Sequence, residues 1–436
     1  MSESQRNAII PKKDWAGITA TIFFFGIISL FIVLAAKFPQ GYLFATYEDL
    51  PGEWTQAFFF ATTLIISLLL TRHTHTNRLF FALLALACFY VVGEEISWGQ
   101  RLLSLPSPEF FQRHNLQQEL NLHNFLTGPT ATWKKRIIEI CLVAGLIGYG
   151  LLYPLLQRRG NRLAQWLADH GLPVPPLYLS PYFVTGALCE VRLFSFNEAE
   201  IAELLIAMAL AFLTLHHFLL NQKGQGHATQ WLPATAMVGI VFVCLIGAGS
   251  VSWYCWKSAG LHEQMENRIT AGQKKFAQRY YRYGDWQNAA ALYEALLSKD
   301  PDNRALLRSL AQTYKETGDE QNFLATNGKA IRLDMIHYSR DPRQIAVNLS
   351  LFQSFQQNGK EEKARLHLTR AMQESRDKVL LEPYNAGSFY WYGQCLQASG
   401  DTAAAKEQFA RAVSMKPTSK KYLQAYRKSL QGGKKS

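Results

Sequence analysis

Long apolar runs are the feature of this sequence that most restricts its fold. Several runs of about 20 mainly apolar residues lie within residues 14–256, and a helix of that length crosses a lipid bilayer. Lipid offers backbone polar groups no hydrogen-bond partner, so these runs are expected to form helices that pack as a bundle. Residues 257–436 contain no comparable run. The sequence therefore predicts an all-α chain, in which a polytopic transmembrane helix bundle precedes a soluble helical part.

Basic residues beside the apolar runs predict the direction in which the chain crosses. Lys12 and Lys13 precede the first run, so residues 1–13 are expected to be cytoplasmic by the positive-inside rule. Residues 39–53 and 99–135 then form external loops. The clear spans are expected over residues 15–36, 54–70, 79–98, 137–156, 197–220 and 231–256.

The stretch Leu177–Phe194 decides the number of spans. It is apolar but contains Pro181, Glu190 and Arg192. If it crosses, the bundle has about seven spans and the C-terminal half lies outside the cytoplasm; if it is re-entrant, there are about six and that half is cytoplasmic. We favour seven, because a crossing brings the acidic residues that follow this stretch to the same face as the acidic residues before residue 99.

Ionisable residues gather at the expected outer face. A GEEISWGQR sequence ends one apolar run and carries Glu94 and Glu95. Charged groups at membrane depth are costly and usually have a function. Farther along, Glu119 and His123 are four residues apart, so on a helix they share one face. We therefore expect these side chains to lie close together, with the acidic start of the span at residues 197–220 beside them.

These residue types are suited to a metal or catalytic site. Zinc takes histidine and carboxylate ligands, and a catalytic zinc ion activates a bound water molecule. The candidate catalytic residues are Glu94, Glu95 and His123. The candidate ligands of a divalent metal such as zinc are Glu95, Glu119, His123, Glu200 and Glu203. The alternative for each residue is a structural role: pairing with Arg101, satisfying a helix N-terminus, or forming an exposed pair on an interfacial helix.

The pattern GEEISWGQR followed by NLQQELNLHN resembles that of polytopic bacterial membrane proteins of no established activity. The resemblance covers roughly residues 80–220. It implies that these residues form one site, and it implies a place in the bacterial inner membrane. It carries no reaction with it.

A second pattern begins after a linker expected at residues 257–270. Small and aromatic residues and a glycine recur when the sequence is shifted by 34 residues, the period of the tetratricopeptide repeat. The first copy contains Phe276, Ala277, Tyr280, Gly284, Ala289, Tyr293 and Pro301, and the last contains Tyr392, Gly393, Leu396, Gly400, Ala405, Phe409, Ala412 and Pro417. Residues 271–425 thus resemble tetratricopeptide repeats, and a basic flexible tail is expected at residues 426–436.

The resemblance implies a solenoid of helical hairpins. Small residues such as Ala277 and Ala412 let the two helices of a hairpin approach, and the glycines mark the turns. One hairpin cannot bury its apolar face alone, so neighbours stack into a superhelix with a concave surface. Such a surface binds a protein or a peptide segment. The alternative is an array that only packs on the membrane domain or dimerises.

Charge and cysteine usage exclude other classes. The net charge is +12, but many basic residues flank apolar runs and no nucleic-acid-binding motif is present. The 6 cysteines form no pair spaced for a disulfide framework or a zinc site. Two functions remain. The first is a membrane-anchored scaffold for partner proteins in envelope biogenesis or secretion. The second is a membrane-embedded hydrolase or transferase that acts on a lipid or lipid-linked substrate at the outer face.

Overall fold

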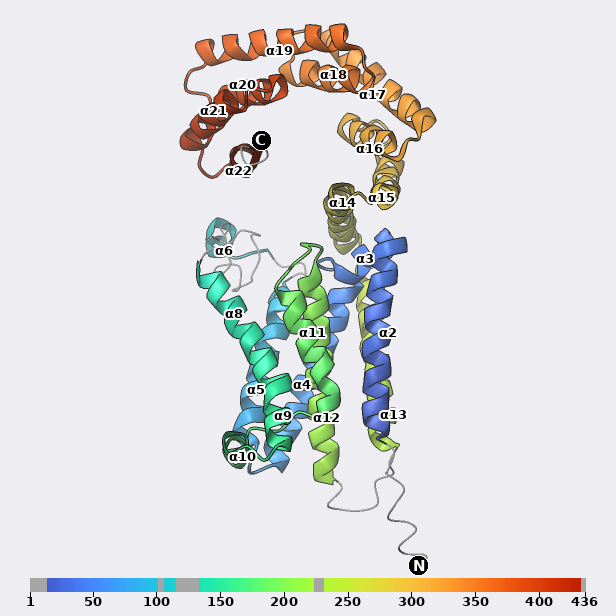
Figure 1. Cartoon of the computed structure of the whole chain (residues 1–436), viewed down its shortest axis with the longest axis vertical. Helices are drawn as coiled ribbons and strands as arrows, with labels where there is room; N and C mark the ends of the chain where they lie inside the picture. Colours follow the sequence, from blue (N-terminus) through green and yellow to red (C-terminus); the bar gives the residue numbers. More distant parts are fainter. Residues whose placement is uncertain (1–13, 101–105, 115–132, 223–230, 433–436) are drawn as a thin grey trace, which may run out of the picture. The chain divides into compact units, whose positions relative to one another are not determined.

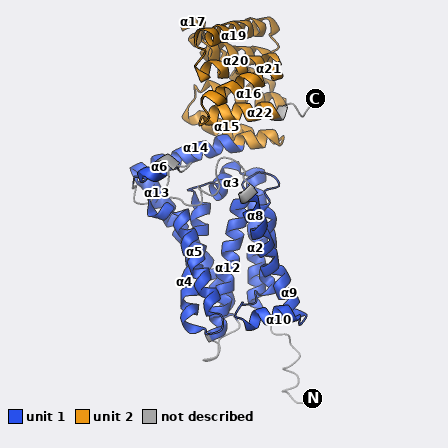
Figure 2. Cartoon of the chain, turned by 90° about the vertical axis from the view of Figure 1, so that its left-hand side faces the viewer, with its two compact units in different colours: residues 1–276 blue, residues 277–436 orange. Residues whose placement is uncertain are grey.

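A computed structural model of the chain describes residues 14–100, 106–114, 133–222 and 231–432. Within these ranges the chain is helical and has no strand. It divides after Phe276 into two compact units, which are coloured separately in Figure 2. The fold class is all-α, as the sequence predicts.

The first unit is a bundle of long helices (Figure 1). Its elements are α2 (Trp15–Lys37), α3 (Pro39–Thr46), α4 (Pro51–His73), α5 (Arg78–Glu95), α6 (Glu109–His114), α8 (Trp133–Ile147), a π-helical turn (Gly148–Leu152), α9 (Tyr153–Arg158), α10 (Arg162–Asp169), α11 (Ser180–Glu190), α12 (Glu198–Gln222), α13 (Leu232–Lys257) and α14 (Ala259–Arg282).

Five helical stretches in the described part of the chain are long and apolar enough to cross a membrane. They are Trp15–Lys37, Pro39–His73, Arg136–Arg158, Glu198–Asn221 and Leu232–Lys257. Helices α2 and α13 expose large apolar side chains such as Phe25 and Phe242 on their outer surfaces. An apolar surface of this extent is stable when lipid or another protein covers it.

The stretch at residues 177–194 differs from a regular span. Its helical part is a short 3₁₀ turn (Leu177–Leu179) followed by α11, which has 11 residues. A helix of that length is too short to cross a bilayer alone, because about 20 residues are needed. Pro173, Pro175 and Pro176 precede it in a segment without regular secondary structure. Proline lacks the backbone N–H that a helix interior needs. If this stretch crosses the bilayer, non-helical chain therefore covers part of the bilayer thickness.

Contacts at the two ends of this stretch locate it along the bundle. Asn77 Nδ2, after the C-terminal end of α4, donates to the Gly171 carbonyl at 3.1 Å. Asn197 Nδ2 donates to the Thr46 carbonyl, before the N-terminal end of α4, at 2.7 Å. Residues 171–197 therefore run the length of α4 in the opposite direction.

Two expected connections are helical instead. The external loop expected at residues 39–53 contains α3, and the linker expected at residues 257–270 lies mostly within α14. Leu261, Met265 and Ile269 in α14 are buried and four residues apart. This spacing places them on one helix face, which packs against the bundle and keeps the segment helical.

The second unit is a series of antiparallel helical hairpins. Its helices are α15 (Trp286–Lys299), α16 (Arg304–Thr317), α17 (Glu320–Arg340), α18 (Ile345–Gln357), α19 (Glu361–Leu381), α20 (Ala386–Ser399), α21 (Thr402–Met415) and α22 (Lys420–Gly432). Helices α16 and α17, α18 and α19, and α20 and α21 form packed pairs. The extra residues between repeats lengthen α17 and α19 to 21 residues each.

The repeat pattern explains these hairpins. The four glycines at the turns have positive φ, a conformation that side chains with a Cβ rarely adopt: Gly284, Gly318, Gly359 and Gly400. Gly393 meets the Phe409 ring so closely that a Cβ there would lie 2.7 Å from it. Small repeat residues are thus required where helices touch, and the sequence-based assignment of turns is confirmed.

Candidate functional site

The GEEISWGQR segment forms a compact end to α5. The chain turns back after Glu95, and Ser97 and Trp98 both have positive φ. The Trp98 ring lies over Gly93, where a Cβ would come within 2.9 Å of it. Trp98 Nε1 donates to Glu94 Oε1 at 2.9 Å. One of the two adjacent carboxylates is therefore bound to the tryptophan of its own segment.

Glu95 lies among carboxyl groups from other helices. It is within hydrogen-bonding reach of Glu53 in the first turn of α4, and the charges of Glu203 and Glu200 act on it from α12. Two carboxyl groups can hydrogen-bond to each other only when one of them carries a proton. We call Glu53, Glu95, Glu200 and Glu203 the carboxyl cluster.

Buried polar groups surround the carboxyl cluster. Gln56, one turn after Glu53, is buried; its Nε2 donates to the Glu200 carbonyl at 2.8 Å, and its amide also reaches the Glu200 side chain. Among described residues its Oε1 has no hydrogen-bond donor. Arg192 brings positive charge to Glu203 and also lies 3.8 Å from Glu190. Lys275 brings positive charge to Glu200.

Other candidate residues are placed differently. Glu198 accepts hydrogen bonds from the backbone N–H groups of Phe194 and Phe196, each at 2.5 Å, so it has a structural role at the start of α12. His216 Nδ1 lies 3.1 Å from the Tyr178 hydroxyl inside the bundle. Glu119 and His123 lie outside the described residues.

The metal hypothesis has no direct geometric support in the described part of the chain. There, no three histidine, cysteine, aspartate or glutamate side chains are arranged to hold a metal ion. The charges of Glu200 and Glu203 act on Glu95, and the binding of a metal ion by these residues stays a prediction. The arrangement can share protons among carboxyl groups and can bind a positively charged or proton-donating group.

Sequence reasoning missed Glu53 and Gln56. It placed Glu53 in an external loop, because the apolar run was taken to begin at Trp54. A signal was present: Pro51 suits the first turn of a helix, and Glu53 and Gln56 are three residues apart on one face of it. Helix α4 indeed begins at Pro51.

A groove lies along the second unit. It encloses about 540 Å³ and is lined by the first helices of successive hairpins, α16, α18 and α20. Arg304 and Arg308 stand at one end, held by hydrogen bonds of 2.8 and 2.9 Å to Asp334 of α17. Trp391 stands at the other, with exposed Gln353 between them. Asp300 and Asp302 also line it, so the groove combines charges of both signs, amide groups and an aromatic ring.

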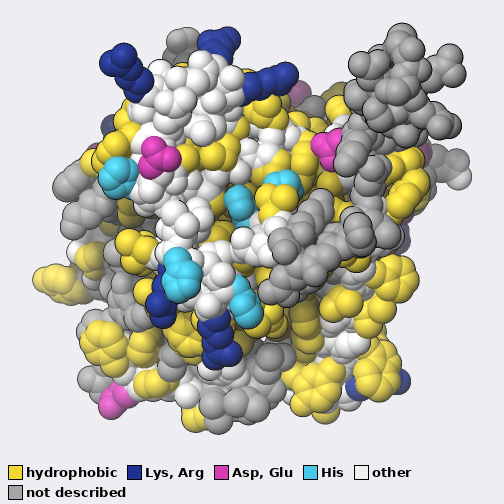
Figure 3. All heavy atoms as spheres, turned by 90° about the horizontal axis from the view of Figure 1, so that it is seen from below, with side chains coloured by type: hydrophobic (Ala, Val, Ile, Leu, Met, Phe, Trp, Pro, Cys, Tyr) yellow, Lys and Arg dark blue, Asp and Glu magenta, His cyan; other side chains and the backbone are white. Residues whose placement is uncertain are grey.

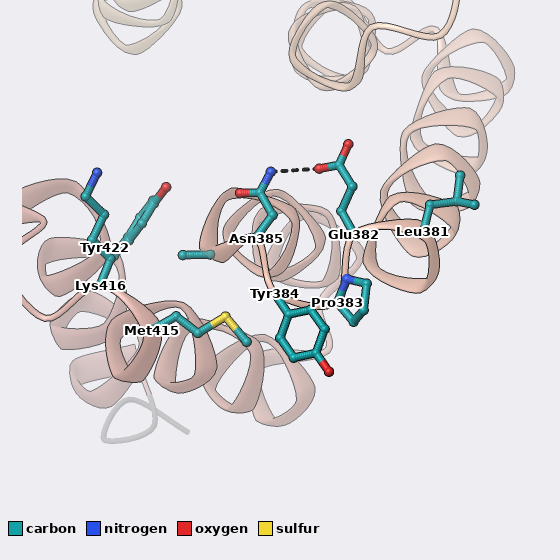
Figure 4. A pocket seen from close by; sticks show the side chains of 9 residues that line it. Leu381, Glu382, Pro383, Tyr384, Asn385, Met415, Lys416 and Tyr422 are labelled. Carbon is teal, nitrogen blue, oxygen red and sulfur yellow. Dashed lines mark hydrogen bonds between the residues drawn. The ribbon is translucent and has the colours of Figure 1, made fainter.

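A second hollow lies where the connection before α20 meets the connection before α22 (Figure 4). Tyr384 and Met415 line it, and Glu382 accepts a 2.7 Å hydrogen bond from Asn385. Tyr384 and Leu381 are among the most exposed apolar side chains of this unit. The hollow is an open surface feature formed by the lengthened α19 and its turn.

The comparisons with known proteins bear on the second unit. The family model for the tetratricopeptide repeat matches residues 270–313. Comparison with characterised proteins finds no match. The matched residues contain α15 and parts of α14 and α16, and the later hairpins repeat the same turns. Residues 270–313 therefore match a tetratricopeptide repeat, and the later hairpins of the second unit resemble it in their turns.

Proposed function

We propose that the chain is a membrane-anchored scaffold of the bacterial inner membrane, whose tetratricopeptide repeats recruit a partner protein in envelope biogenesis or secretion. The observation that carries this proposal is the groove along α16, α18 and α20. The apolar helices of the first unit would hold it at the membrane. Seven crossings are supported by the course of residues 171–197 along α4.

The groove is suited to an extended peptide. Gln353 and Gln394 can bond to a peptide backbone, as amide side chains both donate and accept. Arg304 and Arg308 favour a carboxylate, because a guanidinium binds it with two hydrogen bonds. Trp391 offers an aromatic face for an apolar side chain, and such rings often contribute most to binding. We infer a partner segment that is extended and carries at least one acidic group.

Photo-crosslinking in cells tests this function. A photoreactive amino acid at Gln353, in the groove, is expected to crosslink to one partner protein. The matched control places it at Arg365, which lies on α19 with a side chain 81% exposed. Trp391→Ala should weaken the crosslink at Gln353 by at least about tenfold, since losing a buried aromatic anchor costs about 2 kcal/mol or more. Equal crosslinking from both positions would contradict the scaffold proposal.

The carboxyl cluster favours a second function, a membrane-embedded hydrolase or transferase that acts on a lipid or lipid-linked substrate at the outer face. Carboxyl groups from α4, α5 and α12 meet there, and clustered ionisable groups in a bundle usually have a function. Glu95, hydrogen-bonded to Glu53, is the candidate general acid or base. Glu94 and His123, and a metal ion such as zinc bound by Glu95, Glu119, His123, Glu200 and Glu203, remain part of this proposal.

Hydrolysis of a radiolabelled bacterial lipid extract by the purified full chain tests this second function. Wild-type protein should release water-soluble label, and Glu95→Gln should lower the rate by about 10²- to 10⁴-fold, because general acid–base catalysis contributes that much. Glu263→Gln, at an exposed position of α14, should leave the rate unchanged. If wild-type protein releases nothing with or without added zinc, the enzyme proposal is rejected and the scaffold remains.

A further inference from the structure

One end of the first unit carries a basic face. It is formed by residues 72–78, which run from the last turn of α4 to the first residue of α5, and by residues 158–171, which include α10. We propose that this face binds the headgroups of anionic phospholipids. The inference rests on the proposed membrane anchoring and adds a class of ligand to it.

The two segments of the face are packed against each other. Asn77 Nδ2 donates to the Gly171 carbonyl at 3.1 Å. Gly171 has φ of +89°, and a Cβ there would lie 2.2 Å from the Thr76 carbonyl oxygen. Tyr153 donates from its hydroxyl to the Leu172 carbonyl at 2.8 Å, which ties the same turn to α9. The face is therefore a fixed surface built from segments distant in sequence.

Its charge is strongly positive. Five exposed arginines lie on these segments: Arg72, Arg78, Arg158, Arg159 and Arg162. Asp169 is the acidic residue within residues 158–171, and no ion pair joins any of these arginines to a described residue. Figure 3, which views the molecule from this end, shows lysine or arginine and histidine side chains on this face, with apolar and acidic side chains between them. Unpaired positive charge at a fixed surface attracts an anionic partner.

Helix α10 supplies the apolar part of the face. Asn161 caps it by accepting from the Leu163 N–H at 2.9 Å. Ala164 is buried, whereas Leu163 is 61% and Trp166 53% exposed. The Trp166 ring contacts the His170 ring in a tilted arrangement, with 4.2 Å between ring centroids. Tryptophan and leucine beside arginine on a short surface helix are typical of a helix that lies at the lipid–water boundary.

The positions of the arginines favour lipid over another anionic partner. Arg72 lies in the last turn of α4, Arg78 begins α5 and Arg158 ends α9. These are the ends of apolar helices, where phospholipid headgroups lie if the helices cross. The inner leaflet contains anionic lipids, and each arginine near its surface adds to the attraction. An anionic headgroup, with Trp166 and Leu163 at the boundary below it, fits this arrangement.

Native mass spectrometry of the purified full chain tests the proposal. The protein is titrated with phosphatidylglycerol or phosphatidylcholine, and retained lipid is counted. Wild-type protein should retain phosphatidylglycerol preferentially. The Arg158→Gln, Arg159→Gln, Arg162→Gln triple variant should lower that affinity by about 10- to 100-fold and leave phosphatidylcholine binding unchanged. The triple Arg→Lys variant at the same positions should retain the preference, because the attraction depends on charge.

The charge-matched control replaces Arg340, Arg376 and Arg427, which are exposed on the second unit, by glutamine. It should bind phosphatidylglycerol as wild-type protein does. An equal loss of phosphatidylglycerol affinity in both triple Arg→Gln variants, or no loss in either variant, would overturn the proposal. Carbonate extraction of cell membranes distinguishes a failure of membrane anchoring from a failure of the headgroup site alone. If the chain is extracted, membrane anchoring fails as well; if it stays but binds both lipids equally, only the headgroup site fails.

Discussion

Replacing Asp334 by alanine is expected to destabilise the repeat unit by about 3–5 kcal/mol, the usual cost of breaking a buried ion pair. Asp334 is fully buried and joins α17 to Arg304 at 2.8 Å and to Arg308 at 2.9 Å. The Arg308 side chain is only 16% exposed, so the variant leaves a positive charge with little water and no partner. Burial raises the pKa of Asp334 although both guanidinium groups oppose that shift.

Hydrogen exchange of the full chain in detergent measures this loss, through protection of α16 and α17. The matched control is Asp302→Ala. Asp302 pairs with Lys329 at 3.0 Å, but its side chain is 71% exposed, so the expected loss is below about 1 kcal/mol. Similar losses in both variants would show that the buried pair contributes no more than a surface pair. The same arginines line the groove, so Asp334→Ala should also weaken crosslinking at Gln353.

A reporter enzyme fused after Ser436 is expected to be active only outside the cytoplasm, an all-or-none result. The reason is the course of residues 171–197, which run the length of α4 between contacts at its two ends. With this stretch as a crossing, the bundle has about seven spans and the repeat unit lies on the side opposite to the N-terminus. A reporter that functions only in oxidising or only in reducing surroundings distinguishes the compartments.

A second fusion makes the topology test internally controlled. Placed after Gln222, at the end of α12, the reporter should be active only in the cytoplasm, opposite to the fusion after Ser436. If residues 177–194 are re-entrant, both results reverse. That outcome would place the start of α12 at the inner face. Glu95 and Glu203, which interact in the bundle, could then not both lie at the outer face, and an outer-face enzyme would be excluded.

The sequence by itself determined the features that depend on local patterns. Runs of apolar residues predicted the helices of the bundle, and five stretches in the described part of the chain have the required length and hydropathy. Helix α5, which covers most of the span expected at residues 79–98, has 18 residues and is not among the five. The repeat period predicted the hairpins, because Gly284 and its counterparts occupy positions that need positive φ. These signals are strong because backbone sterics and helical spacing act over a few residues.

Only the tertiary structure decided which polar groups meet. Glu94 and Glu95 are adjacent in sequence, yet one binds Trp98 and the other joins Glu53, Glu200 and Glu203 from separate helices. The segment at residues 257–270 became helical because α14 buries Leu261, Met265 and Ile269 against the bundle. Arg158 and Arg72 share one face because the turn at Gly171 packs on Thr76. Side-chain partners that are 94 and 182 residues apart depend on how helices rotate and pack, and no local pattern encodes that.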